Sequence, residues 1–272
     1  MGRRARRRAL AQLQANTTTT TTTELILVQP LPTDKLTIEI CIHCHNYQHR
    51  LCWMLSSILQ NTGTDLPNII VNISYAPGNG SPTTEEVCKF FREKGLNIKE
   101  TLVAKENACN RGKARNMQVK ETTSDYMLFA DSDLVYDPLF FDDLHKQIKD
   151  KLWNIKLVMG ADRYSLNDQF CISYFEKDTN VYPCEIPDVA SITDKWPVKW
   201  IQGRHVAPGF FQLARTSIIK AKGNTYVSRS RDLWRGTYSD RIFRKRLGGR
   251  TPIIVKRMYH LNHDRGGPEI QR

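Results

Sequence analysis

The 272-residue sequence contains no long apolar run. A helix that crosses a bilayer needs roughly 20 consecutive apolar residues, and no stretch approaches that length. The N-terminal arginines are also not followed by the hydrophobic segment of a secretory signal. We therefore expect a protein with neither a signal peptide nor a membrane span, located in the cytoplasm or peripheral to a membrane.

The cysteines show no regular spacing. There are seven of them, an odd number, in a chain that is large enough to fold without covalent cross-links. This pattern argues against a disulfide-rich secreted domain. We expect the thiols to be reduced.

Acidic residues are missing from the first 23 positions, which carry five arginines and end in a run of threonines. Such a segment cannot bury enough apolar surface to fold. We predict a disordered, basic and Thr-rich tail at 1–23, which could contact an anionic surface weakly, and one domain at 24–272. The remaining basic residues are dispersed, so no nucleic-acid partner is expected. The pI near 9.4 keeps a nucleic-acid-binding protein without catalysis as an alternative.

Apolar periodicity alternates between the strand and helix patterns through the first half of the chain. The predicted strands are 36–42, 68–75, 100–106 and 125–133, and the predicted helices are 49–61, 83–95 and 111–122. The second half is less regular, with a strand at 155–163 and a short helix at 240–249. This order predicts an α/β fold with a mostly parallel central sheet flanked by helices.

Two carboxylates follow the most apolar of these strands in the segment YMLFADSDLVY. In an extended chain, residues two apart point to the same side, so Asp131 and Asp133 can converge where an open α/β sheet binds ligands. Paired carboxylates suit a hard cation such as Mg²⁺ or Mn²⁺. The alternative is a polar loop in which this spacing arose by chance.

The segment CIHCHNYQH at 41–49 carries two cysteines and three histidines. A zinc site here would need ligands from both faces of a strand, and no second pair lies at finger spacing. The turn also has no glycine, which argues against a sugar nucleotidyltransferase, because that chemistry needs a glycine-rich phosphate loop after the first strand.

The segment from NRGKARN to the DSD at 131–133 resembles the region around the D-x-D motif of GT-A glycosyltransferases, especially family-2-like and β-1,4-galactosyltransferase-like enzymes. The first turn and helix also resemble family 2, at the matching positions Asn46, Leu51, Leu55, Ser57 and Thr62. The resemblance implies a single GT-A (Rossmann-like) domain with a nucleotide-binding half at about 36–135 and an acceptor half at about 136–272.

The resemblance also implies an activity in glycan biosynthesis. A metal-dependent, inverting glycosyltransferase would move a hexosyl, N-acetylhexosaminyl or xylosyl group from a nucleotide diphosphate sugar, with a UDP-sugar favoured, to a glycan or other hydroxyl acceptor. The cofactor would be Mn²⁺ or Mg²⁺. A sugar nucleotidyltransferase and a catalytically inactive scaffold of the same fold remain alternatives.

Three groups of site residues follow from the resemblance. The expected catalytic base is Asp240 in YSDRIFRKRLGG, which could instead be a simple helix cap. The expected donor-binding residues are His43, Asn46, Arg111, Arg115, Asp131 and Gln212. The expected metal ligands are Asp131, Asp133, His260 and His263, with no choice made between the two histidines.

The sequence departs from the family pattern at two places. Ile73 and Ser74 stand where family-2 enzymes carry the acid that recognises uracil, which puts uridine specificity in doubt. Ser239 replaces a glutamate beside the expected base. The segment APGFFQLAR at 207–215 matches the family's glycine-containing loop under the donor sugar, although it could equally be an apolar packing segment.

Overall fold

The structure is a computed structural model, and it describes only part of the chain. The described residues are 35–78, 83–152, 158–160, 163–165, 199–201, 209–223, 226, 236–247, 250–252 and 258–261. The predicted tail at 1–23 and His263 lie outside these ranges. Within the described residues, no helix has the length and apolarity that a membrane span requires.

The first half alternates strands and helices as the sequence predicts. Its elements are β1 (Thr37–His43), α2 (Gln48–Leu59), β2 (Asn68–Tyr75), α3 (Thr84–Glu93), β3 (Ile98–Leu102), the short 3₁₀ helix η1 (Lys105–Asn107), α4 (Arg111–Glu121) and β4 (Tyr126–Ala130). Helix α3 begins with a capping box between Thr83 and Glu86, which satisfies backbone groups at its start. Gly95 follows this helix with φ 104°, a conformation that glycine adopts without a steric penalty.

The second half supplies shorter elements. They are β5 (Leu134–Tyr136), α5 (Phe140–Gln147), the π-helical turn η2 (Ile148–Leu152), β6 (Val158–Gly160), β7 (Arg163–Ser165), β8 (Lys199–Ile201), β9 (Phe211–Arg215), α8 (Thr216–Ala221), α9 (Gly236–Leu247), β10 (Arg250–Pro252) and β11 (Met258–His260). Strand β9 is buried along its whole length. The segment 211–215 is therefore a core strand, whereas the loop expectation can apply only to the residues before it.

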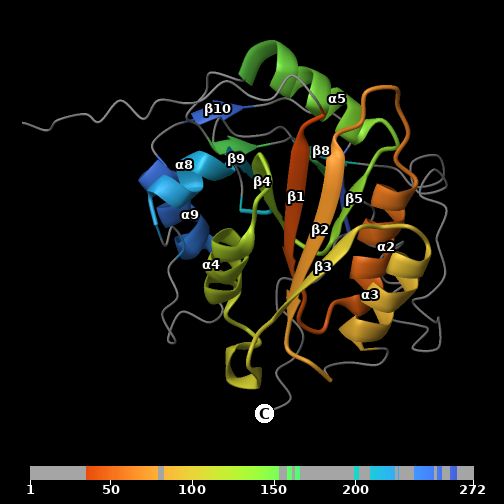
Figure 1. Cartoon of the computed structure of the whole chain (residues 1–272), viewed down its shortest axis with the longest axis vertical. Coiled ribbons are helices and arrows are strands. Elements are labelled where there is room, and N and C mark those ends of the chain that lie inside the picture. Colours follow the sequence, from red (N-terminus) through yellow and green to blue (C-terminus); the bar gives the residue numbers. More distant parts are fainter. Residues whose placement is uncertain are drawn as a thin grey trace, which may run out of the picture.

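Two sheets organise these elements (Figure 1). The seven-stranded sheet has the order β10-β6-β9-β4-β1-β2-β3, in which β9 runs antiparallel to both of its neighbours. A smaller sheet has the order β5-β11-β7-β8. The chain passes from β1 to β2 and β3 on one side and returns to β4 on the other. The ends of β1 and β4 therefore form a topological switch point, where open α/β sheets bind ligands.

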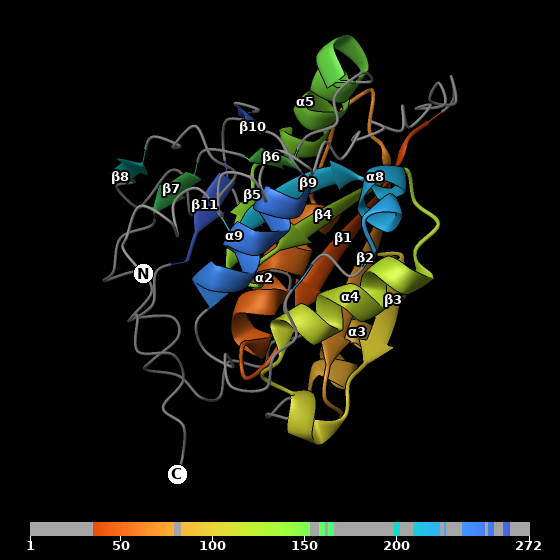
Figure 2. The ribbon, with the colours of Figure 1, turned by 90° about the vertical axis from the view of Figure 1, so that its left-hand side faces the viewer.

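Helices cover both faces of the large sheet. Helices α4, α8 and α9 lie together on one face, toward the viewer in Figure 2, whereas α2 and α3 lie on the other. The alternation of β1 places Cys41 in the α4 layer, while Ile40 and Ile42 point into the α2 and α3 layer. Cys44 also belongs to the second layer. Cys41 and Cys44 therefore lie on opposite faces of the sheet, so they cannot share a zinc ion.

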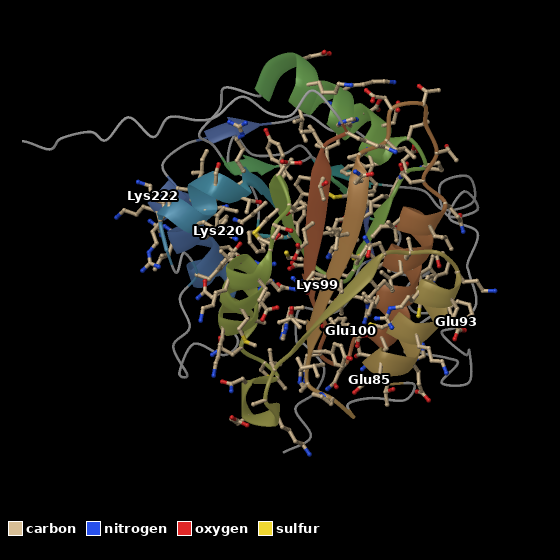
Figure 3. All side chains as sticks on the ribbon, in the orientation of Figure 1. Glu85, Glu93, Lys99, Glu100, Lys220 and Lys222 are labelled. Atoms are coloured by element: carbon tan, nitrogen blue, oxygen red, sulfur yellow. The ribbon has the colours of Figure 1, made fainter. Side chains whose placement is uncertain are left out.

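Strand β3 and helix α8 carry charged side chains on opposite sides of the structure (Figure 3). Strand β3 forms one edge of the large sheet and carries Lys99 and Glu100, which Figure 3 labels. Charges on an edge strand disfavour pairing with a second sheet. Figure 3 also shows Lys220 and Lys222 projecting beside α8, away from Glu85 and the rest of α3.

Candidate active site

Several of the sequence-predicted site residues meet at the switch point. His43 ends β1, Asp131 directly follows β4, and Arg111 is the first residue of α4. These positions share one edge because β1 and β4 are adjacent parallel strands. The fold therefore brings together residues from separate parts of the sequence.

Helix α4 directs two arginines toward this edge. Asn110 caps the helix by accepting a hydrogen bond from the Lys113 backbone N–H at 3.0 Å. Arg111 and Arg115 are four residues apart, so their side chains lie on the same side of the helix. The N–H groups and the dipole at this end of the helix also favour negative charge.

Arg111 and Arg115 each bridge the same two carboxylates, and the four side chains form what we call the charge quartet. Arg111 donates to Asp131 Oδ1 at 2.7 Å and to Asp240 Oδ2 at 2.8 Å. Arg115 donates to Asp240 Oδ1 at 2.8 Å and to Asp131 Oδ1 at 3.3 Å. Burial raises the pKa of Asp131, while the two guanidinium groups oppose that change. Burial lowers the pKa of the Arg111 guanidinium. The carboxylates of Asp131 and Asp240 raise it by more, so the net shift of this pKa is upward.

Aromatic rings hold Arg115 in place. Its guanidinium carbon lies 5.6 Å from the Phe129 ring centroid and 5.1 Å from that of Tyr226, distances at which a cation is attracted to a ring. Tyr226 stacks on Phe243 of α9, with centroids 4.3 Å apart. Its hydroxyl donates to Gln212 Oε1 at 2.7 Å. Arg115 is therefore a fixed part of the core.

Asp240 lies inside helix α9, because the helix begins four residues earlier, at Gly236. Its carboxylate accepts hydrogen bonds from Arg111 and Arg115, so the helix-cap interpretation is wrong. Gly209 lies against this carboxylate: a Cβ atom at position 209 would be 2.1 Å from Asp240 Oδ2. Position 209 therefore has no room for a side chain while Asp240 keeps its place.

Asp133 and His260 form a second pair beside the quartet. His260 Nε2 lies 3.2 Å from Asp133 Oδ2. Antiparallel pairing of β11 with β5 sets this contact, together with the bond from Leu261 N–H to the Asp133 carbonyl at 2.9 Å. Two cis ligands of an octahedral cation with bonds near 2.1 Å lie about 3.0 Å apart, so this pair fits a divalent ion. The third expected ligand, Asp131, faces the arginines instead, and no three-residue metal group exists among the described residues.

His43 is bonded on both ring nitrogens. Its Nε2 lies 2.7 Å from the Ala108 carbonyl oxygen, and its Nδ1 lies 3.1 Å from Ser74 Oγ. Burial lowers the pKa of His43 to about 3, outweighing the Ala108 carbonyl, and Arg111 acts in the same direction as burial. The neutral ring must donate from Nε2, because a carbonyl only accepts. His43 thus ties β1 to β2 and to the loop before α4.

Two other expected donor contacts differ in exposure. Asn46 is exposed in the turn after β1 and has φ 59°. Gln212 is fully buried, and its amide bonds the Tyr226 hydroxyl and the Asp240 carbonyl oxygen, the latter at 3.4 Å. A direct donor contact by Gln212 would require these bonds to break.

Sequence reasoning missed two residues of the site, Gly209 and Tyr226. Tyr226 has no motif around it, and only the fold places it against Arg115. Gly209 follows a proline in the segment 207–215, which signals a turn but not a contact with Asp240. Ile73 and Ser74 are both buried in β2, so the expected uracil-binding acid has no counterpart at these two positions.

These observations define a class of protein. A largely parallel sheet with acidic residues after β4, and with a small second sheet that carries a histidine to them, is the architecture of a GT-A glycosyltransferase domain. Residues 39–155 match the family model Glycosyl transferase family 2. This segment of the chain is therefore similar to family-2 glycosyltransferases, and the fold is that of a GT-A domain. The β-1,4-galactosyltransferase-like subtype gains no support and stays a prediction.

Solved structures show the same fold. The S. aureus TarS 1–349 complex with UDP-GlcNAc has a TM-score of 0.55 at 14% identity, covering 82% of this chain and 58% of that chain. The complex with UDP has a TM-score of 0.54, also at 14% identity, with 82% and 60% covered. The longer TarS structure has a TM-score of 0.54 at 13% identity, with 83% and 36% covered. The chain thus spans about a third to three fifths of these proteins, and no curated protein matches it.

Proposed function

We propose that this protein is a metal-dependent, inverting glycosyltransferase that moves a sugar from a nucleotide diphosphate sugar to a hydroxyl acceptor, such as a glycan. The observation that carries the proposal is the charge quartet beside the Asp133–His260 pair at the switch point. It combines positive charge for a departing diphosphate, a carboxylate for the acceptor and oxygen and nitrogen ligands for a cation.

The donor is proposed to be a UDP-sugar carrying a hexosyl, N-acetylhexosaminyl or xylosyl group. Similar structures contain UDP and UDP-GlcNAc, which supports a uridine nucleotide. The absence of an acid at Ile73 and Ser74 means that another group must recognise the base. The backbone around His43 and Asn46, at the carboxyl end of β1, is the proposed contact.

The proposed metal, Mn²⁺ or Mg²⁺, would be held by Asp133 and by His260 or His263. When bound, it would neutralise negative charge on the diphosphate that leaves. Arg111 reaches the same region and adds positive charge. Asp131 would contact the ribose or a metal-bound water.

The proposed base is Asp240. It would take the proton of the acceptor hydroxyl as that oxygen attacks the anomeric carbon, which inverts the configuration. Asp240→Asn keeps the size of the side chain, so we expect a folded protein whose sugar transfer falls by about a hundredfold or more. NMR of the anomeric proton in the first product tests inversion. A retained configuration would contradict this role.

A donor-hydrolysis screen tests the function as a whole. UDP-, GDP- and TDP-sugars would each be incubated with Mn²⁺ or Mg²⁺, and then with EDTA. We expect hydrolysis of one nucleotide class that EDTA abolishes and that Asp133→Asn weakens together with donor binding. Full turnover in EDTA would overturn the metal assignment. A separate incubation with a nucleoside triphosphate tests the alternative. Release of pyrophosphate there would point to a sugar nucleotidyltransferase.

A further inference from the structure

The two arginines of the charge quartet differ in their access to solvent. The Arg111 side chain is 27% exposed, whereas that of Arg115 is 0% exposed. Arg115 is also enclosed by the rings of Phe129 and Tyr226. A ligand that enters the site can therefore reach Arg111 but cannot reach Arg115 without opening the core.

Both oxygens of Asp240 are occupied in this arrangement. Oδ1 accepts from Arg115 and Oδ2 accepts from Arg111, each at 2.8 Å. Each oxygen therefore has one guanidinium partner, and release of Arg111 would leave Oδ2 without its arginine.

The quartet contains two positive and two negative side chains, so their formal charges cancel. A nucleoside diphosphate brings at least two further negative charges to the same edge of the sheet. Asp131 and Asp240 already hold Arg111 through its two terminal nitrogens. The diphosphate and these carboxylates must therefore compete for Arg111, the accessible cation of the quartet.

We propose that Arg111 is shared between Asp240 and the donor diphosphate, so that donor binding withdraws Arg111 and frees Asp240 Oδ2 for the acceptor proton. Arg115 is a positioning residue that stays bonded to Oδ1 and keeps the carboxylate in place. This division of roles rests on the proposed function. It makes donor occupancy the step that turns Asp240 into a working base.

The competition has a measurable consequence for binding alone. If Asp240 holds Arg111 away from the diphosphate, removing the charge of Asp240 should strengthen the binding of UDP. A hydrogen bond between charged groups is worth enough that we expect Asp240→Asn to lower the Kd for UDP about tenfold. This direction is unusual for a change within an active site, which ordinarily weakens binding or leaves it unchanged.

A double-mutant cycle measured by titration calorimetry tests the proposal. UDP would be titrated into the wild type, Asp240→Asn, Arg111→Gln and the double variant. We expect Arg111→Gln to weaken binding and Asp240→Asn to give no gain in that background. Glu106→Gln is the matched control, because Glu106 is an exposed acid before α4. It reports any general effect of removing one negative charge.

The outcomes separate this inference from the function on which it rests. If the wild type binds UDP and Asp240→Asn binds it equally or more weakly, Arg111 is not shared and the glycosyltransferase proposal stands. An equal gain in Glu106→Gln would also refute the sharing. If the wild type binds none of UDP, GDP and TDP, both proposals are wrong. Asp240→Ser gives the same readout if thermal melting shows that Asp240→Asn does not fold.

Discussion

Gly209→Ala is the substitution whose effect the structure predicts most directly. A Cβ at position 209 would lie 2.1 Å from Asp240 Oδ2 and 2.8 Å from its Cγ, whereas ordinary contacts begin near 3.4 Å. The carboxylate or the loop must therefore move by about 1 Å. If the Asp240 carboxylate moves, a shift of this size takes its 2.8 Å bonds from Arg111 and Arg115 beyond hydrogen-bonding distance.

Two magnitudes follow from this displacement. Overpacking beside a buried side chain costs about 1 to 3 kcal/mol of the free energy of unfolding. A misplacement of about 1 Å at a reacting group costs about a hundredfold in rate. We expect both effects in Gly209→Ala, measured by urea unfolding and by sugar transfer from the donor that the hydrolysis screen identifies.

Asp240→Ala provides the control background for this substitution. It removes Cγ and both oxygens, and the remaining contact to the Asp240 Cβ is 3.3 Å. Gly209→Ala should then cost less than about 0.5 kcal/mol, so the double-mutant cycle should show a clear coupling. An equal cost in both backgrounds would show that the clash with Asp240 is not the cause, and the packing argument would be refuted.

Two further predictions concern stability. The folded-state pKa of His43, about 3, lies below the unfolded value near 6.5. The contribution of His43 to the free energy of unfolding is therefore fully present above pH 6.5 and is lost as the pH falls toward 3. The advantage in unfolding free energy of the wild type over His43→Gln should therefore shrink by up to about 1.4 kcal/mol per pH unit across this window. An advantage that does not change with pH would contradict the neutral, buried ring. Thr83→Ala removes the cap of α3 and should cost about 1 kcal/mol in urea unfolding, whereas Thr83→Ser should cost little. Equal losses in both variants would show that the hydroxyl is not the stabilising group.

Local chemistry made the first half of the fold predictable. Strand β2 occupies the predicted residues 68–75, and the capping box at Thr83 fixes the start of α3. Strand β3 lies at 98–102, two residues before the expected start at 100. These elements follow signals carried by neighbouring residues, namely alternation, capping and glycine stops.

The sequence could not reveal β9 in the same way. Residues 211–215 are a run of only five residues, and the strand is buried on both faces between β4 and β6, so its polar residues do not mark a solvent-facing side. Their proline and glycine neighbours made a loop equally plausible. Pairing with β4, whose partner residues are far away in the sequence, decided that this segment is a strand.

The sequence by itself determined the fold class, because the apolar strand followed by Asp131 and Asp133 and the basic start of α4 are contiguous patterns. Only the tertiary structure decided what those residues contact. Arg111 and Asp240 are 129 residues apart, and they meet because α4 and α9 pack on the same face of the sheet. Charge pairing depends on distance in space, which one-dimensional spacing does not encode. The buried Arg115 and the partly exposed Arg111 therefore look equivalent in the sequence and differ in the fold.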